Sequence, residues 1–212
     1  MYITPATPSL AGSMLAIYTP FITDGAVTFE TIPPSLEDFK KRIETYTTTH
    51  PWLVMMDDNE VAGYAYASPH RERLAYQWVT ECSVYMHPSY KQKGIARSLY
   101  KTLFHILRMQ GFYKVYAGIT LPNDESIGFH EKMGFEWFAT YKEVGYKAGH
   151  WQDVGWWELK LQQTSTQAPQ PPVPFSQLQH TALNPVLAQY INVKGYDRDK
   201  PEEPAPGNPW HG

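Results

Sequence analysis

Residues 83–100 read SVYMHPSYKQKGIARSLY, and this stretch passes from a strand-like segment through a basic bend into an amphipathic helix. Gly94 stands where the helix is expected to begin, and Lys91, Lys93 and Arg97 surround it. The first N–H groups of a helix have no intrahelical partner and attract an anion, so cations at this point indicate a phosphate-bearing ligand. A basic turn before an ordinary surface helix is the alternative.

The bend matches neither of two familiar phosphate-binding motifs. The sequence contains no GxxxxGK[ST], and no GxGxxG follows a predicted strand. Gly94 and the small Ala96 would nevertheless let the main chain approach a pyrophosphate closely, with the N–H groups of residues 92–97 converging on it. The local pattern therefore predicts a diphosphate site without a nucleotide-triphosphatase or dinucleotide fold.

Composition narrows the class of protein. The 212 residues include 18 basic and 21 acidic side chains, and this balance argues against non-specific nucleic-acid binding. The single cysteine, Cys82, excludes an internal disulfide and fits a reducing compartment. No secretory signal and no apolar run of about 20 residues is evident, so we expect a soluble cytoplasmic protein that binds no membrane. The eight histidines lack ligand spacing, so no metal site is expected.

The composition changes near residue 162. Residues 1–161 alternate predicted strands and helices, whereas residues 162–212 contain nine of the 18 prolines. Proline removes a backbone donor and interrupts helices, so the second region is expected to be an extended tail without a core of its own. Its apolar middle, from Phe175 to Ile191, is expected either to lie against the first region or to be disordered.

The first region is predicted to be an α+β domain in which helices connect mostly consecutive strands. Ser35, followed by Asp38, predicts a helix N-cap, and Gly111 predicts the C-cap of the helix that begins at Gly94. The expected helices are 9–18, 36–48, 94–110 and 124–133, and the expected extended segments are 1–4, 26–30, 52–57, 61–69, 76–86, 114–121, 135–144 and 156–161.

Lys91-x-x-Gly94-x-Ala96 resembles the Q/R-x-x-G-x-G/A pyrophosphate loop of the GNAT acetyltransferase superfamily, with Lys91 as a departure at the first position. Further segments, among them GYAYASP, ECSVYMHP and ITLPNDESIGFHEKMGF, resemble the phosphinothricin acetyltransferase family in order and spacing over residues 2–161. The resemblance implies the GNAT fold, a three-layer α/β arrangement with a mixed central sheet flanked by helices. It also implies acetyl-CoA as cosubstrate and a homodimer.

Transfer of an acetyl group to an amine requires a base, because an amine of pKa about 8 or above is mostly protonated at pH 7. The resemblance implies that Glu81 and His130 are the catalytic pair. The residues alone also allow an ion-paired strand glutamate and a helix-surface histidine, and they leave open whether His130 acts as acid, base or proton relay. Strand alternation places Glu81 and Ser83 on one face and Cys82 on the other, so Cys82 is a poor candidate nucleophile.

The resemblance implies two sets of binding residues. The set expected to bind acetyl-CoA is Val84, Tyr85, Met86, Gln92, Lys93, Gly94, Ile95, Ala96, Arg97 and Asn123. The set expected to line the acceptor site is Phe29, Arg71, Arg73, Tyr76, Tyr100 and Val154. An arginine fork would suit a carboxylate or a phosphinate. Asn before a helix is also a good N-cap, which is the structural alternative for Asn123.

These expectations describe an acetyl-CoA-dependent N-acetyltransferase that acts by direct attack. Its acceptor would be the amino group of a small amino-acid-like molecule, of the phosphinothricin, methionine sulfone or methionine sulfoximine type. Arg71-Glu72-Arg73 replaces the Lys-Ala-Arg more usual in the family, Leu74 replaces Asn and Gln152 replaces His, and these departures leave phosphinothricin itself open. Transfer to a peptide N-terminus is one alternative. Another is a non-catalytic acyl-CoA-binding scaffold whose segment PQPPVP, residues 169–174, binds a partner as a polyproline II helix.

Overall fold

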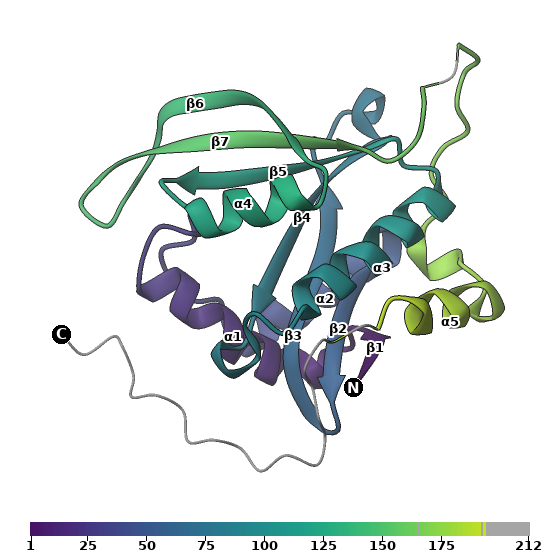
Figure 1. The fold of residues 1–212 in the computed structure, drawn as a ribbon, viewed down its shortest axis with the longest axis horizontal. Coiled ribbons are helices and arrows are strands. Elements are labelled where there is room, and N and C mark those ends of the chain that lie inside the picture. The colour runs from purple at the N-terminus through teal and green to yellow at the C-terminus, as the bar shows by residue number, and fades with distance from the viewer. Residues whose placement is uncertain (165, 192, 194–212) are drawn as a thin grey trace.

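The computed structural model describes residues 1–164, 166–191 and 193. A seven-stranded sheet in the order β1-β2-β3-β4-β5-β7-β6 runs through it (Figure 1). Neighbouring strands are antiparallel except for the parallel pair β4–β5, so the sheet is mixed as expected. The strands are β1 (Tyr2–Pro5), β2 (Trp52–Asp57), β3 (Glu60–Pro69), β4 (Val79–Met86), β5 (Lys114–Leu121), β6 (Glu136–Lys147) and β7 (His150–Lys160).

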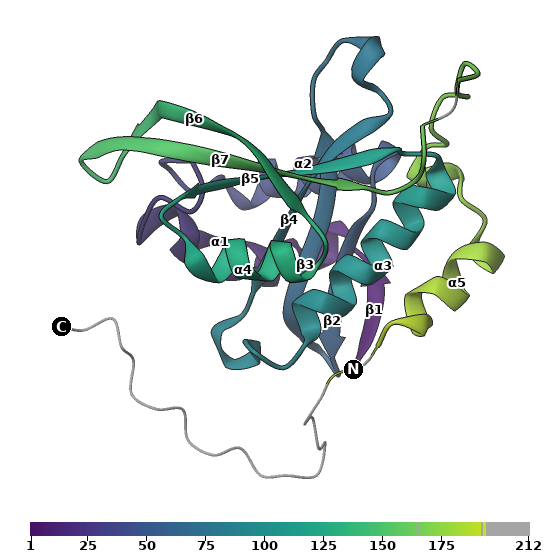
Figure 2. The same cartoon turned by 45° about the horizontal axis from the view of Figure 1, so that its top comes forward.

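Helices cover both faces of the sheet, as the two views show (Figures 1 and 2). The α-helices are α1 (Ala11–Thr23), α2 (Leu36–Thr49), α3 (Ile95–Gln110), α4 (Asp124–Lys132) and α5 (His180–Gln189). Short 3-10 turns are η1 (Pro8–Leu10), η2 (Leu74–Tyr76), η3 (Pro88–Tyr90) and η4 (Phe175–Gln177). None of these helices is long and apolar enough to cross a bilayer.

The core consists of two layers, one on each face of the sheet. Leu53 and Met55 of β2 pack in the layer that contains α3 and α5, whereas Trp52 and Val54 pack in the layer that contains α1 and α2. Every residue of β2 is buried, as expected for a strand covered on both faces. The three-layer arrangement expected from the sequence, a mixed central sheet flanked by helices, is confirmed.

Local capping signals correctly predicted several element boundaries. The Ser35 hydroxyl accepts a hydrogen bond from the Asp38 N–H at 3.1 Å and caps α2. Gly111 ends α3 in the left-handed conformation, at φ 96°. The strand expected at 114–121 coincides with β5.

Other boundaries were wrong for identifiable reasons. The helix expected at 9–18 is α1, which continues past Pro20 to Thr23 because Ile22 is buried in the core. The segment 26–30 is a series of bends and not a strand. The strand expected to begin at Tyr76 begins at Val79, because residues 74–76 form η2. The hairpin of β6 and β7 is longer than the segments 135–144 and 156–161 indicated.

The middle of the proline-rich region packs against the domain and is not extended throughout. Residues 180–189 form α5 although Pro185 lies within it. Phe175, Leu183 and Val186 are buried in the same core layer as α3. Of the two expected alternatives, packing therefore holds for this segment, and residues 194–212 of the expected tail lie outside the described residues.

Candidate active site

β4 and β5 pair over a short length and then separate. The parallel pairing joins Val79–Glu81 to Lys114–Tyr116, although β4 continues to Met86 and β5 to Leu121. Figure 1 shows the two strands diverging. A cleft of about 1400 Å³ opens at this point and reaches the start of α3. The predicted residues that line it are Val84, Tyr85, Met86, Gln92, Gly94, Ile95, Ala96, Arg97, Tyr100, Asn123 and His130.

The loop before α3 has the geometry of an anion site. Gln92 and Gly94 adopt positive φ values of 62° and 81°, and Gly94 is the N-cap of α3. Gly94 has no side chain to cap this helix, and among the described residues no side chain accepts from the N–H groups of its first turn, which also lack an intrahelical partner. Lys91 and Arg97 also line the cleft. Unpaired donors and cations therefore converge on one wall, and this arrangement fits a diphosphate group.

Tyr90 anchors this loop to the β2–β3 hairpin. Its hydroxyl lies 3.0 Å from Asp57 Oδ2 and 3.1 Å from Glu60 Oε2. Burial and these two acceptors raise the pKa of Tyr90 above its usual value, so the hydroxyl remains a donor. Lys93, which was expected to bind the cofactor, does not line the cleft, and its Nζ lies 5.0 Å from the centroid of the Tyr90 ring.

A second set of contacts joins β4, α3 and α4 beside the cleft. His130 Nδ1 lies 2.8 Å from the Ser126 carbonyl oxygen and donates to it, so Nε2 accepts from the Tyr100 hydroxyl at 3.1 Å. Burial lowers the pKa of His130, which keeps the imidazole neutral at pH 7. Tyr100 was expected to contact the acceptor. It is buried in the core, and its hydroxyl is hydrogen-bonded to His130.

Cys82 ends this chain of contacts, with its Sγ 3.5 Å from the Tyr100 hydroxyl oxygen. Burial raises the pKa of the Cys82 thiol to about 12. A neutral thiol is a weak nucleophile, since the thiolate is the reactive form. Cys82 lines the cleft, but it lacks the ionisation that covalent catalysis would need.

Glu81 lies on the other face of β4 and belongs to a separate cluster. Its Oε1 lies 2.8 Å from Nδ1 of His70, the residue that directly follows β3. Glu81 makes no contact with His130 and does not line the cleft wall; it lies at the last position where β4 pairs with β5. Sequence reasoning missed His70, because a lone histidine in a turn carries no motif.

The remaining residues expected at the acceptor site come from several elements, and none lines the described cleft. Tyr76, at the end of η2, packs edge-on against His70 at 6.0 Å between ring centroids. Arg71 and Arg73 are exposed in the turn before η2 and make no ion pair with a described residue. Val154 is buried on β7 opposite Thr120.

Phe29 lies in the loop between α1 and α2, which borders the cleft through Asp24, Gly25 and Val27. The Phe29 ring packs on the backbone of β6 at Gly145, where any Cβ would collide with it. The Lys147 ammonium donates to the Thr28 carbonyl oxygen at 2.7 Å. The loop is therefore held against the β6–β7 hairpin.

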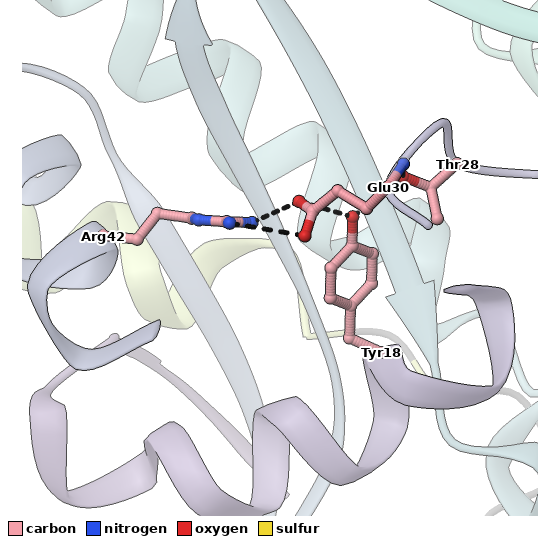
Figure 3. Close-up of polar contacts among 4 residues, drawn as sticks. All are labelled: Tyr18, Thr28, Glu30 and Arg42. Carbon is pink, nitrogen blue, oxygen red and sulfur yellow. Dashed lines mark hydrogen bonds and ion pairs between the residues drawn. The ribbon is translucent and has the colours of Figure 1, made fainter. Parts of the chain in front are cut away.

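Figure 3 shows how the same loop is fixed at its other side. Glu30 accepts from both terminal nitrogens of Arg42, at 2.6 and 3.4 Å, and from the Tyr18 hydroxyl at 3.1 Å. Tyr18 also lies 2.9 Å from Thr28 Oγ1. Arg42 is on α2 and Tyr18 is on α1, so one carboxylate ties the loop to both helices.

Residues 11–156 match the family model for the acetyltransferase (GNAT) domain. The chain is 36% identical over 171 residues to a phosphinothricin N-acetyltransferase of Streptomyces viridochromogenes, covering 81% of this chain and 93% of the relative. It is 31% identical over 153 residues to an L-methionine sulfoximine/L-methionine sulfone acetyltransferase of Pseudomonas aeruginosa, covering 71% and 89%.

A solved structure shares both fold and sequence. A GNAT superfamily phosphinothricin acetyltransferase from Sinorhizobium meliloti, in complex with acetyl-CoA, matches with a TM-score of 0.75 at 32% identity, covering 79% of this chain and 92% of that one. The family model, these relatives, the separated strands and the uncapped helix start agree. The chain therefore belongs to the GNAT acetyltransferase family and is an N-acetyltransferase that uses acetyl-CoA.

Proposed function

We propose that this enzyme acetylates the amino group of a small amino-acid-like molecule, of the phosphinothricin, methionine sulfone or methionine sulfoximine type. The observation that carries the proposal is the cleft that joins the uncapped start of α3 to the gap between β4 and β5. The activities named for the relatives from Streptomyces viridochromogenes and Pseudomonas aeruginosa support this class of acceptor.

The cofactor would lie along this cleft. Gln92 and the first turn of α3, from Gly94 to Arg97, would hold the pyrophosphate with main-chain N–H groups. The edge of β4 from Val84 to Met86 has no partner in β5, so its main-chain groups are available to the amides of the pantetheine arm. Asn123 already caps α4 through Oδ1, at 3.1 Å from the Ser126 nitrogen, which leaves its side-chain amide N–H groups for the cofactor.

The proposed reaction assigns a proton acceptor and a proton donor to different sides of β4. Glu81 takes a proton from the ammonium group of the acceptor, directly or through one water. The amine nitrogen then bonds to the thioester carbonyl carbon as the carbon–sulfur bond breaks. The departing thiolate takes the proton of the Tyr100 hydroxyl, which is paired with His130, and the second proton lost by the nitrogen returns to the Tyr100 oxygen. The neutral Cys82 thiol supports direct attack without an acyl-enzyme.

Arg71 and Arg73 are proposed to bind the anionic part of the acceptor. Both are exposed near the Glu81–His70 pair in sequence, and neither is engaged in an ion pair with a described residue. A guanidinium matches a carboxylate or a phosphinate through two parallel hydrogen bonds. Replacement of either arginine by Gln is expected to raise KM for the acceptor and to leave KM for acetyl-CoA unchanged.

The test is an acceptor screen with the purified protein. Release of free thiol from acetyl-CoA is followed with phosphinothricin, methionine sulfoximine, methionine sulfone, ordinary amino acids and peptides with free N-termini. We expect turnover with amino-acid-like acceptors, and a loss of about 100-fold or more in kcat for Glu81→Gln. Glu136→Gln, an exposed change on β6, is the matched control. Thermal stabilisation by acetyl-CoA without thiol release from any acceptor would refute the proposal and favour the scaffold.

One observation weighs against the scaffold alternative. The polyproline segment 169–174 is bound by its own domain: the Val173 N–H donates to the Gln110 carbonyl oxygen at 2.8 Å, and Gln110 Nε2 donates to the Val173 carbonyl oxygen at 2.8 Å. Trp78 Nε1 donates to the Gln170 carbonyl oxygen at 2.9 Å. A partner that reads this segment would have to displace these contacts.

We also propose that the enzyme is a homodimer. The hairpin of β6 and β7 exposes aromatic side chains, and β6 is an edge strand of the sheet. The exposed aromatic residues of this hairpin are Trp137, Phe138, Tyr141, Tyr146 and Trp151. Exposed apolar surface of this kind marks interaction sites. Sedimentation velocity at micromolar concentration is expected to give a dimer, and a monomer across the concentration range would refute this assembly.

A further inference from the structure

We propose that His70 is a positioning residue for the Glu81 carboxylate; the inference rests on the proposed role of Glu81 as base. His70 Nδ1 lies 2.8 Å from Glu81 Oε1, and the two side chains are only 14% and 31% exposed. A partly shielded hydrogen bond to a carboxylate is stronger and more directional than an exposed one. The pair is therefore suited to fix a catalytic group.

The sheet itself brings the two residues together. In the antiparallel register of β3 and β4, Ser68 is opposite Glu81 and Pro69 is opposite Thr80. His70 is the first residue after β3, so its backbone is held beside the start of β4. Thr80 Oγ1 donates to the Ser68 carbonyl oxygen at 2.6 Å, which adds a contact at the same point. The distance between His70 and Glu81 thus follows from strand pairing.

Three aromatic rings hold the imidazole. The ring centroid of His70 lies 4.7 Å from that of Tyr116 on β5, 6.0 Å from that of Trp156 on β7 and 6.0 Å from that of Tyr76 on η2. The Lys114 ammonium lies 5.7 Å from the centroid of the Tyr116 ring and is hydrogen-bonded to Glu158 Oε2 at 2.7 Å. Packing from three elements leaves the imidazole little freedom to leave the carboxylate.

The hydrogen bond from His70 distinguishes the two carboxylate oxygens of Glu81. The Nδ1–H of His70 donates to Oε1, whereas Oε2 accepts no hydrogen bond from any described residue. Oε2 is therefore the oxygen left to take the proton of the amine or of a bridging water. A base that is held in one orientation keeps a short path to its proton, and proton transfer depends steeply on such geometry. His70 would act on the rate through Glu81 and not by touching the acceptor.

Two substitutions separate the hydrogen bond from the packing. His70→Asn keeps a side-chain N–H donor near the position of Nδ1, whereas His70→Leu removes it with little change in volume. We expect His70→Leu to lower kcat about 10- to 100-fold with KM for acetyl-CoA unchanged, and His70→Asn to retain activity within a few-fold of the wild type. The control is His105→Leu, because His105 also donates or accepts through Nδ1, to Tyr190 at 3.0 Å, but lies on α3 away from Glu81.

A double variant tests whether the effect of His70→Leu on kcat depends on Glu81. If His70 acts only through this carboxylate, His70→Leu should cause no further loss in a Glu81→Gln background. Unchanged kcat in His70→Leu overturns the inference, and so does an equal loss in the Leu and Asn variants, which would reveal packing alone. If Glu81→Gln lowers kcat but His70→Leu does not, only this inference fails. If Glu81→Gln is fully active, the proposed base itself is wrong.

Discussion

The Tyr100 hydroxyl lies 3.1 Å from Nε2 of His130 and joins α3 to α4 beside the cleft. The direction of this bond is fixed, because Nδ1 of the same imidazole donates to the Ser126 carbonyl oxygen at 2.8 Å. Burial lowers the pKa of His130, so the neutral ring accepts a hydrogen bond from the Tyr100 hydroxyl. Tyr100 and His130 therefore line the cleft as a hydrogen-bonded pair, and His130 is not an isolated histidine.

Tyr100→Phe is expected to lower kcat about 10-fold or more, because the pair proposed to protonate the thiolate loses its hydroxyl. The variant should also lose about 1–3 kcal/mol of unfolding free energy, since the buried Nε2 of His130 is left without a donor. Thiol-release kinetics and denaturant unfolding measure the two effects. Tyr113→Phe is the control, because the Tyr113 hydroxyl makes no hydrogen bond with a described residue. Full activity of Tyr100→Phe would exclude the hydroxyl from the reaction.

Gly94→Ala is expected to weaken acetyl-CoA binding, because Gly94 has φ 81° at the N-cap of α3 and an L side chain is strained there by about 1 kcal/mol or more. A shift of the loop would misdirect the N–H groups proposed to bind the pyrophosphate. We expect KM for acetyl-CoA to rise several-fold, with a smaller change in kcat. Gly12→Ala in α1, where a Cβ meets open space, should leave KM unchanged and slightly stabilise the protein. An unchanged KM in Gly94→Ala would contradict the assigned anion loop.

Glu30→Gln is expected to loosen the loop that borders the cleft, because a neutral amide cannot replace the carboxylate that receives Arg42 and Tyr18. The Glu30 side chain is 32% exposed, so the loss of unfolding free energy should be about 1 kcal/mol or less. The larger effect should be a several-fold rise in KM for the acceptor. Glu44→Gln, an exposed change on α2, is the matched control. Identical acceptor kinetics in the two variants would show that this anchor does not shape the site.

The stability of the protein should fall as the pH drops from about 7 to about 4. Burial lowers the pKa of His50 to about 4, whereas the unfolded chain has an ordinary histidine pKa of about 6.5. Between these values only the unfolded state binds the proton, so the contribution of His50 is complete above about pH 6.5 and lost as the pH falls, by about 3 kcal/mol in all.

Denaturant unfolding at pH 7.5 and pH 5 measures this effect. His50→Gln should reduce the difference in unfolding free energy between the two pH values. Part of the difference should remain, because the pKa of the buried His130 is also lowered. The same difference in His50→Gln and in the wild type would show that His50 does not carry the effect.

Features that depend on neighbouring residues could be predicted from the amino-acid sequence. Ser35 and Gly111 mark helix ends because capping is a contact within a few residues, and both were correctly predicted. Gly94 and the cations around it predicted an anion loop for the same reason, since a helix start exposes its own N–H groups wherever it occurs. The family and its fold were also recognisable, because many short segments agreed in order and spacing.

Contacts between side chains that are distant in the sequence became visible only in the folded protein. The pairing of β3 with β4 sets His70 against Glu81, and the packing of α4 on α3 sets His130 against Tyr100; neither contact leaves a spacing rule in the sequence. The formation of α5 despite Pro185 has a similar origin, because burial of Leu183 against α3 offsets the hydrogen bond that proline removes. Hydrogen bonds within a turn are encoded locally, whereas contacts between elements depend on how the whole sheet and its helices pack.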